Sequence, residues 1–234
     1  MPTSLEVCHG EARFVLNGDG SLYLPDQHSL LLADLHWGKA THFRKAGIPT
    51  PQGIVTSNEQ RLRAALERHP NSRVFFLGDL FHSTQNSENY RLRSLLEDYP
   101  EHRCTLVLGN HDRDLPPWDC LAFCEQVQLD ERIELRHEPP GCDFDRQVPF
   151  AEPNGEDGGN ETARGTRVIA GHLHPAVLLR GAGKGRARIP AFFFNHWLTV
   201  LPPFGTFTGH HVLKEPGSYY GLVDGQVFAL NDGM

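Results

Sequence analysis

Short apolar runs that lead into polar clusters alternate with amphipathic segments in the first half of the chain. Residues 29–36, 73–77 and 104–108 begin as apolar runs of strand length, and acids, amides or histidines stand at or just after their ends. Between these runs, residues 56–68 and 88–99 carry leucines at intervals of three and four, which predicts helices with one buried face. The alternation indicates βαβ units and a largely parallel sheet, so we expect an α/β fold.

The second half of the chain is expected to be richer in strands. Strands are predicted at residues 132–136, 167–170, 176–180 and 189–202. Two hairpins are predicted at residues 11–24 and 219–230, because Asn-Gly and Asp-Gly pairs supply their tight turns. Prolines and glycines between Gly38 and Gly53 indicate a loop and not a helix. Residues 138–165 lack an apolar period and are expected to form a mobile surface loop within a single domain, residues 1–234.

The polar clusters at the strand ends carry the candidate chemistry. In a strand over residues 29–36, a period of two places Asp34 and His36 on the same side at the carboxyl end, where open α/β sheets bind ligands. The other strands end in further oxygen and nitrogen donors: Asp79 and His82, Asn110, His111 and Asp112, His137, and His172 and His174. Such donors suit Mn, Fe, Zn or Mg, and one shared carboxylate holds two ions roughly 3.5–4 Å apart. A dinuclear metal site is therefore expected.

The net charge bears on which substrate such a site binds. The formal net charge of −7 does not favour a polyanionic partner, because nucleic-acid binders usually carry a basic face. Two divalent cations would add four positive charges and bring −7 to −3. Basic residues follow the first motif at Lys39, Arg44 and Lys45, whereas many acids fall within residues 152–161. Nucleic acid therefore stays open as a substrate.

Cysteines and apolar runs bear on the compartment. The five cysteines form no paired CxxC units, so we expect reduced thiols and neither a disulfide framework nor a zinc ribbon. No charged leader with an apolar core stands near Met1, and no apolar run reaches the roughly 20 residues of a membrane span. A cytoplasmic protein without membrane contact is expected.

The ordered motifs DLH (residues 34–36), GDLFH (78–82), GNHD (109–112), the single His137 and GHLH (171–174) together resemble the calcineurin-like metallophosphoesterase superfamily. The flanking runs at residues 31–53 and 201–209 are similar to those of its bacterial DNA-ligase-associated, PdeM-like endonuclease branch. His210 departs from that pattern, in which a second glycine is expected after Gly209. The resemblance implies a four-layer αββα sandwich with two facing mixed sheets.

The resemblance also implies a role for each motif residue. One metal would be held by Asp34, His36 and His174, the other by Asn110, His137 and His172, and Asp79 would bridge them. Mn²⁺ is the favoured ion, with Fe, Zn and Mg as alternatives. A water or hydroxide shared by the two ions would attack the phosphodiester in line, His111 would protonate the leaving alkoxide, and His82 would orient His111.

The position of His82 bears on the substrate. Phosphoprotein phosphatases of the superfamily carry an aspartate there, whereas its double-strand-break repair nucleases carry a histidine, as this chain does. We therefore expect a DNA endonuclease in repair, acting on single-stranded or distorted DNA and associated functionally with a ligase and a helicase. The alternative is a phosphohydrolase of cyclic nucleotides or nucleotide-sugar derivatives, which the acidic charge favours. A metal-bearing scaffold without activity is disfavoured because every ligand position is filled.

Several further residues have both a functional and a structural interpretation. Substrate phosphates would contact a cluster of four residues, each of which by itself is more typical of a solvated surface: Lys39, His42, Arg44 and Arg113. The run from Lys184 to Arg188 is a weaker candidate for backbone contact and is expected to be a hairpin tip. Asp112 is expected to bind local backbone, residues 192–194 to lie in the core, and Trp37 and Phe81 to line the cleft.

Overall fold

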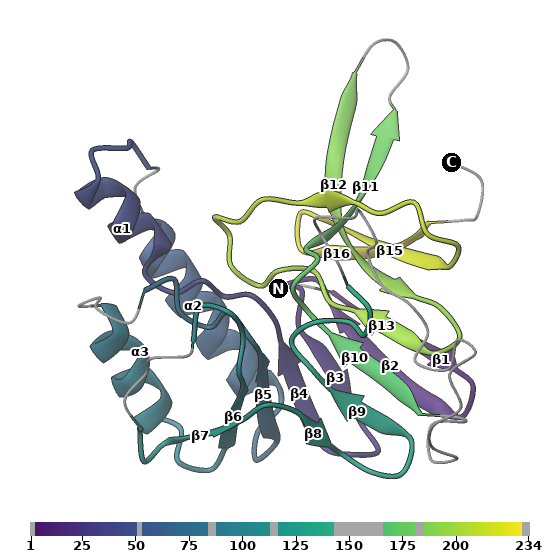
Figure 1. Cartoon of the computed structure of the whole chain (residues 1–234), viewed down its shortest axis with the longest axis horizontal. Helices are drawn as coiled ribbons and strands as arrows, with labels where there is room; N and C mark the ends of the chain where they lie inside the picture. The colour runs from purple at the N-terminus through teal and green to yellow at the C-terminus, as the bar shows by residue number, and fades with distance from the viewer. Residues whose placement is uncertain are drawn as a thin grey trace.

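Two mixed β-sheets face each other in the computed structural model, and helices cover the outer side of the first sheet (Figure 1). The structure describes residues 3–50, 53–83, 88–112, 117–142, 166–180 and 185–230. Most of the predicted loop, residues 143–165, and Arg113 lie outside these ranges. The facing sheets confirm the expected fold class, and the division into a single domain stays a prediction.

The first sheet contains the parallel strands that the alternating pattern predicted. Its order is β1 (Ser4–His9), β2 (Ala12–Asn17), β3 (Leu22–Leu24), β4 (Ser29–Leu32), β5 (Arg73–Leu77), β6 (Arg103–Val107) and β7 (Leu121–Cys124). Strands β1 to β4 form an antiparallel meander, and β4 to β7 are parallel. The carboxyl ends of β4, β5 and β6 therefore meet at one edge.

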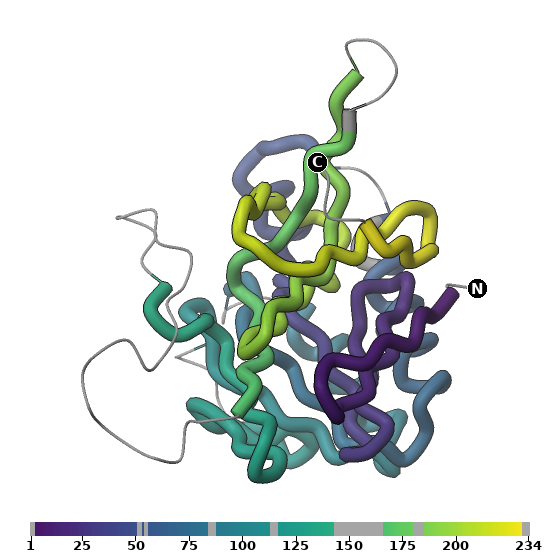
Figure 2. The backbone as a smooth tube through the Cα atoms, turned by 90° about the vertical axis from the view of Figure 1, so that its right-hand side faces the viewer, coloured from purple at the N-terminus to yellow at the C-terminus, as the bar shows by residue number. Residues whose placement is uncertain are grey.

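The second sheet is mostly antiparallel. It contains β8 (Val127–Gln128), β9 (Ile133–Leu135), β10 (Arg167–Ala170), β11 (Pro175–Arg180), β12 (Arg186–Phe194), β13 (Leu198–Val200), β14 (His211–Val212), β15 (Ser218–Val223) and β16 (Gln226–Leu230). Strand β10 runs parallel to both β9 and β13, so β9 and β10 end at the same edge. Figure 2 shows the two sheets from the side, with the hairpin of β11 and β12 extending beyond them.

Three helices are described: α1 (Lys39–Lys45), α2 (Ile54–Arg68) and α3 (Glu88–Glu97). Helices α2 and α3 match the predicted ones, but the prediction of a loop over Gly38–Gly53 was wrong for α1. The glycines and prolines lie outside the helical stretch, and Gly38 begins it with a φ of 81° that suits glycine. Basic residues in the last turn of α1 interact favourably with the helix dipole. None of the described helices combines the length and apolarity needed to cross a membrane.

Apolar side chains fill three layers. Leucines of α2 and α3, such as Leu62 and Leu92, pack against the outer face of the first sheet. Between the sheets, Phe192 and Phe194 pack with residues of both sheets, whereas Phe193 lies in a third cluster with Trp197. Residues 192–194 are therefore core, as predicted. Among the described residues, helices cover only the first sheet. The third cluster lies on the side of the second sheet that faces away from the first sheet.

The prediction that Trp37 and Phe81 line the cleft was wrong for Phe81, whereas Trp37 borders the small pocket beside the first motif. Both side chains lie in the core. They are 2 % and 0 % exposed, respectively, and belong to the core beneath α2 and α3. The segments after β4 and β5 continue to pair through the bonds from Trp37 N–H to the Leu80 carbonyl and from His82 N–H to the Trp37 carbonyl. Trp37 is therefore held beside the segment after β5, and its side chain packs in the core.

Asp112 anchors the loop after β5 to the loop after β6. Its buried carboxylate accepts hydrogen bonds from the backbone N–H groups of Gly109 at 3.0 Å, Phe81 at 3.1 Å and Leu80 at 3.4 Å. Burial raises the pKa of Asp112, and these hydrogen bonds offset part of that rise. The predicted structural role of Asp112 is confirmed.

All five cysteines carry free thiols, as expected. Cys104 lies in the core beneath α2 and α3, where burial raises its pKa to about 12. Its thiol is therefore protonated at neutral pH and chemically unreactive.

Replacing Phe192 with alanine is expected to lower the free energy of unfolding by about 3–5 kcal/mol, because it opens a cavity between the sheets. Chemical denaturation measures this loss. The matched control is Phe228→Ala, since Phe228 is 45 % exposed; it should cost about 1 kcal/mol or less. Equal losses in the two variants would contradict the placement of Phe192 in the core.

Replacing Asp112 with alanine is expected to destabilise the protein by at least about 2 kcal/mol, because each buried N–H left without an acceptor costs about 1–3 kcal/mol. Asp112→Asn keeps an acceptor oxygen and should lose less. Unfolding is measured in the presence of a chelator, so that metal binding does not contribute. Wild-type stability of Asp112→Ala would refute the anchoring role.

Candidate metal centre

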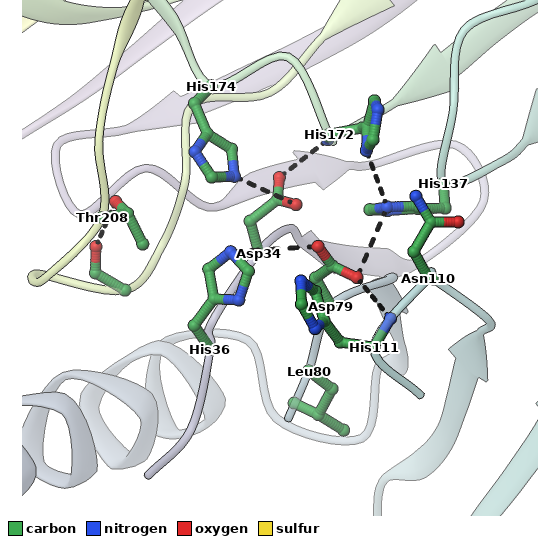
Figure 3. A network of polar contacts seen from close by, with 12 residues as sticks. Asp34, His36, Asp79, Leu80, Asn110, His111, His137, His172, His174 and Thr208 are labelled. Carbon is green, nitrogen blue, oxygen red and sulfur yellow. Dashed lines mark hydrogen bonds and ion pairs between the residues drawn. The ribbon is translucent and has the colours of Figure 1, made fainter. Parts of the chain in front are cut away.

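The five polar clusters meet at one edge of the two sheets. Asp34 and His36 follow β4, Asp79 follows β5, and Asn110 and His111 follow β6 in the first sheet. From the second sheet, His137 follows β9, while His172 and His174 follow β10. Figure 3 shows these side chains converging on a common centre. The polar clusters at the strand ends therefore come together, as the sequence predicted.

Five of these residues have left-handed backbone conformations. The φ angles are 51° at Asp34, 45° at His36, 45° at Asp79, 67° at His172 and 45° at His174. The prediction of a strand through His36 was wrong, because β4 ends at Leu32. Asp and Asn, and to a lesser degree His, adopt this conformation more readily than β-branched residues do. The chain thus turns sharply at each of these five residues instead of alternating as a strand.

The first group of candidate ligands is Asp34, His36 and His174, whose ligand atoms lie within 4.8 Å of one another. Asp34 is fully buried, and its Oδ2 accepts a hydrogen bond from the His172 N–H at 2.9 Å. Its Oδ1 lies 3.3 Å from His174 Nε2, yet neither atom completes a hydrogen bond within the described residues. His174 Nδ1 is 3.0 Å from the Gly209 carbonyl and donates to it, so Nε2 presents a lone pair. These unmatched atoms fit a cation.

The second group is Asp79, His137 and His172, again with ligand atoms within 4.8 Å. His137 Nδ1 donates to the Leu77 carbonyl at 3.0 Å, which leaves Nε2 facing His172 Nδ1, also at 3.0 Å. Gly78 makes room for this ring, because a Cβ at Gly78 would lie 2.0 Å from His137 Nδ1. Two imidazole nitrogens and a carboxylate converge as metal ligands do.

Asp79 connects the two groups. Its Oδ1 lies 3.6 Å from His137 Nε2, and its Oδ2 lies 3.9 Å from His36 Nε2. One carboxylate oxygen therefore faces each group, which is the geometry of a bridging ligand.

The electrostatics suit metal binding. Burial would raise the pKa of Asp34, but its contact with His174 and the nearby histidines lowers it overall. Burial lowers the pKa of His36 to about 3 and, with the neighbouring His137, also lowers the pKa of His172. His174 differs: burial opposes its charge, but contact with Asp34 raises its pKa. Ionised carboxylates and neutral imidazoles are the forms that bind metal, and a cation beside Asp34 would take the place of the proton on His174, so the donor set fits a divalent cation in each group.

Asn110 lies at the exposed rim of the second group. Its amide nitrogen donates to Glu138 Oε1 at 2.8 Å, and its carbonyl oxygen remains available as a ligand. Glu138 Oε1 also lies 3.6 Å from His172 Nε2. Sequence reasoning missed Glu138, although an acid directly after a candidate ligand was a usable signal. The structure brings all seven predicted ligands together, and their binding of metal stays a prediction.

The two predicted catalytic histidines lie beside the first group. The ring centroids of His111 and His82 are 5.8 Å apart, and that of His36 is 5.7 Å from His111. His111 is exposed, while its backbone N–H donates to Asp79 Oδ1 at 3.1 Å. His82 is half-buried and stacks on Phe43, and burial followed by nearby cationic groups lowers its pKa to about 4. The pair thus adjoins the candidate metal ligands.

The predicted substrate-binding residues differ in how close they come to this centre. Lys39 lines a small pocket together with His36, and burial lowers its pKa although Asp79 and Asp34 oppose the shift. The ring of His42 lies 4.9 Å from that of His82. Arg44 instead donates to Thr41 Oγ1 at 2.9 Å on the exposed side of α1. The fourth residue, Arg113, lies outside the described residues.

Comparisons with solved structures show the fold. The nuclease MPE of Pseudomonas putida is similar with a TM-score of 0.74 and 23% identity, over 97% of this chain and 100% of that one. A protein of unknown function from Aquifex aeolicus matches with a TM-score of 0.38 and 18% identity, over 67% of this chain and 82% of that one. The latter score is too low to indicate a shared fold. A search of curated proteins found no match.

The sequence also matches a family model. The model describes the calcineurin-like phosphoesterases and matches residues 28–161, which is more than half of the 234 residues. The matched region includes Asp34, His36, Asp79, Asn110 and His137. The chain belongs to the calcineurin-like phosphoesterase family.

Proposed function

We propose that this chain is a Mn²⁺-dependent phosphodiesterase that cleaves DNA as an endonuclease in repair. The observation that carries the proposal is the position of His111 and His82 beside two candidate ligand groups joined by Asp79. The pairing of two histidines, in place of an acid and a histidine, favours a phosphodiester over a phosphoprotein. The fold of the Pseudomonas putida nuclease MPE supports nuclease chemistry.

The family fold implies two divalent metals, and the chain offers two groups to hold them. Asp34, His36 and His174 would hold one ion, and Asp79, His137 and His172 the other, with Asn110 completing the second set. When bound, such ions neutralise charge on phosphoryl oxygens. They also lower the pKa of a bound water, so that it supplies a nucleophile at neutral pH. Mixed oxygen and imidazole donors without thiolates accommodate Mn²⁺, as they do Fe, Zn and Mg.

His111 is proposed as the general acid. Its backbone is held by Asp79 Oδ1, while its ring is exposed and therefore accessible to a substrate. A deoxyribose alkoxide is a poor leaving group, so a proton donated by the imidazole lowers the barrier to its departure. His82 adjoins His111 and is itself buttressed by Phe43, which keeps the two rings in a constant relation.

Helix α1 provides the proposed phosphate contacts next to the centre. Lys39 lies three residues after His36 and is half-buried near Asp34 and Asp79, so its ammonium reaches the site. His42 and Arg44 lie further along the same helix and offer donors to phosphates beyond the scissile one. Arg113, a cytoplasmic location and functional association with a DNA ligase and a helicase stay predictions.

Circular single-stranded DNA with Mn²⁺ is the first test. Because a circle has no ends, we expect the wild-type protein to linearise it and Asp79→Ala to be inactive, since that change removes the carboxylate shared by both groups. Gel electrophoresis follows the reaction. An intact circle together with rapid hydrolysis of cyclic nucleotides would favour the small-molecule phosphohydrolase instead.

The general acid is tested by changing the leaving group. His111→Ala is expected to slow DNA cleavage by about 10²–10⁴-fold, because a general acid contributes about that factor. Hydrolysis of a nitrophenyl diester should fall much less, since nitrophenolate leaves without a proton. Initial rates on both substrates give the comparison, and equal losses on the two would refute the assignment of His111.

A further inference from the structure

The hairpin of β11 and β12 projects from the molecule and begins at the candidate metal centre. Strand β11 starts at Pro175, directly after His174. Figure 1 and Figure 2 both show the hairpin extending beyond the two sheets. The register pairs Ala176 with Pro190 and Leu178 with Arg188, so the start of β12 lies at the far end of β11. The hairpin is therefore an arm whose base is at the centre and whose far end, where Arg180 pairs with Arg186, is remote from it.

The arm carries two arginines on one face. Arg186 and Arg188 are both exposed, and their spacing of two places them on the same side of β12. Neither forms a hydrogen bond or ion pair with any residue in the described part of the chain. By contrast, three arginines of α2 and α3 pair with carboxylates: Arg63 with Asp98, Arg91 with Glu59, and Arg93 with Glu97. The charges of the arm are thus available to a ligand.

His210 lies between these arginines and the centre. The next residue, His211, donates its backbone N–H to the His174 carbonyl at 2.9 Å, which places His210 at the base of the arm. The neighbouring Gly209 carbonyl accepts the hydrogen bond of His174, and β14 pairs with the base of β11 at Pro175 and His211. His210, Arg188 and Arg186, which we name the basic track, therefore lead from the centre along the arm.

We propose that the basic track binds the phosphates of a DNA strand as it leaves the centre. This inference rests on the proposed function, because it assumes that DNA is the substrate. At about 3.3 Å per residue, Arg188 lies roughly 10 Å and Arg186 roughly 17 Å beyond Pro175 along the arm. A strand in duplex DNA rises 3.4 Å per nucleotide along the axis, and an extended single strand spaces its phosphates more widely, so these distances correspond to at most about three and five nucleotides. Helix α1 and the arm then hold the substrate from different sides.

The arm makes the enzyme selective for length and sensitive to salt. Each phosphate contact in single-stranded DNA changes the slope of log K against log salt by about 0.7, so removing two contacts should reduce the slope by about 1.4. A diester too short to reach the arm makes neither contact. The basic track therefore strengthens the binding of polymeric DNA and does not affect the chemical step at the centre.

The test compares Arg186→Ala/Arg188→Ala with wild type on long single-stranded DNA and on thymidine 5′-(p-nitrophenyl) phosphate. We expect the KM for DNA at low salt to rise about five- to twentyfold, and its salt dependence to weaken as above. The rate on the nitrophenyl ester should match wild type. Oligonucleotides that end at the scissile phosphate on the arm side should no longer distinguish the two proteins.

The single variant Arg188→Ala is measured as well, and its charge-matched control is Arg103→Ala. Arg103 is exposed at the start of β6, which is the end of the strand opposite the centre. If Arg103→Ala raised the KM for DNA as much as Arg188→Ala, or if the double variant kept the wild-type salt slope, the proposed role of the arm would be refuted. The proposed nuclease activity would be unaffected by either result. A parallel loss on the nitrophenyl ester would also refute the role of the arm. Wild-type protein that hydrolyses the ester but cuts no DNA would instead refute the proposed function and, with it, the arm.

Discussion

Left-handed backbone at the candidate ligands is the constraint on which the centre depends. Asp34, His36, Asp79, His172 and His174 all hold positive φ angles, and each such residue costs of order 1–3 kcal/mol. Bonds between successive loops maintain these conformations, such as those from His36 N–H to the Asp79 carbonyl and from Gly171 N–H to the His137 carbonyl. These contacts offset the cost of the left-handed conformations, which turn the five side chains toward the common centre.

The ligand arrangement also depends on contacts between the two sheets. Asp34 belongs to the first sheet but accepts a hydrogen bond from the His172 N–H of the second, and the Ala33 carbonyl accepts one from Phe204 N–H. The first candidate group likewise takes Asp34 from one sheet and His174 from the other. The apolar layer between the sheets, which includes Phe192 and Phe194, therefore determines whether the ligands come within reach of one another.

Charge is distributed so that an acidic protein still offers a basic approach to its centre. The net charge is −7, yet α1 and the arm of β11 and β12 both begin within three residues of a candidate ligand and carry basic side chains away from it. Many other arginines are paired on the surface, as Arg63 and Arg93 are. The local arrangement of charge is thus more informative about the substrate than the sum.

The sequence by itself determined the strands and helices of the parallel region, because apolar periodicity reports local burial, and it placed donors at the strand ends. It failed at α1, where flanking glycines and prolines concealed a short helix. It also failed at Phe81, because a motif does not show which way each side chain points. Only the tertiary structure decided that Glu138 joins the rim, that Asp112 binds three N–H groups and that the arm projects from the centre. These relations join residues of separate loops and strands, and such distances depend on how the sheets pack and not on any local pattern.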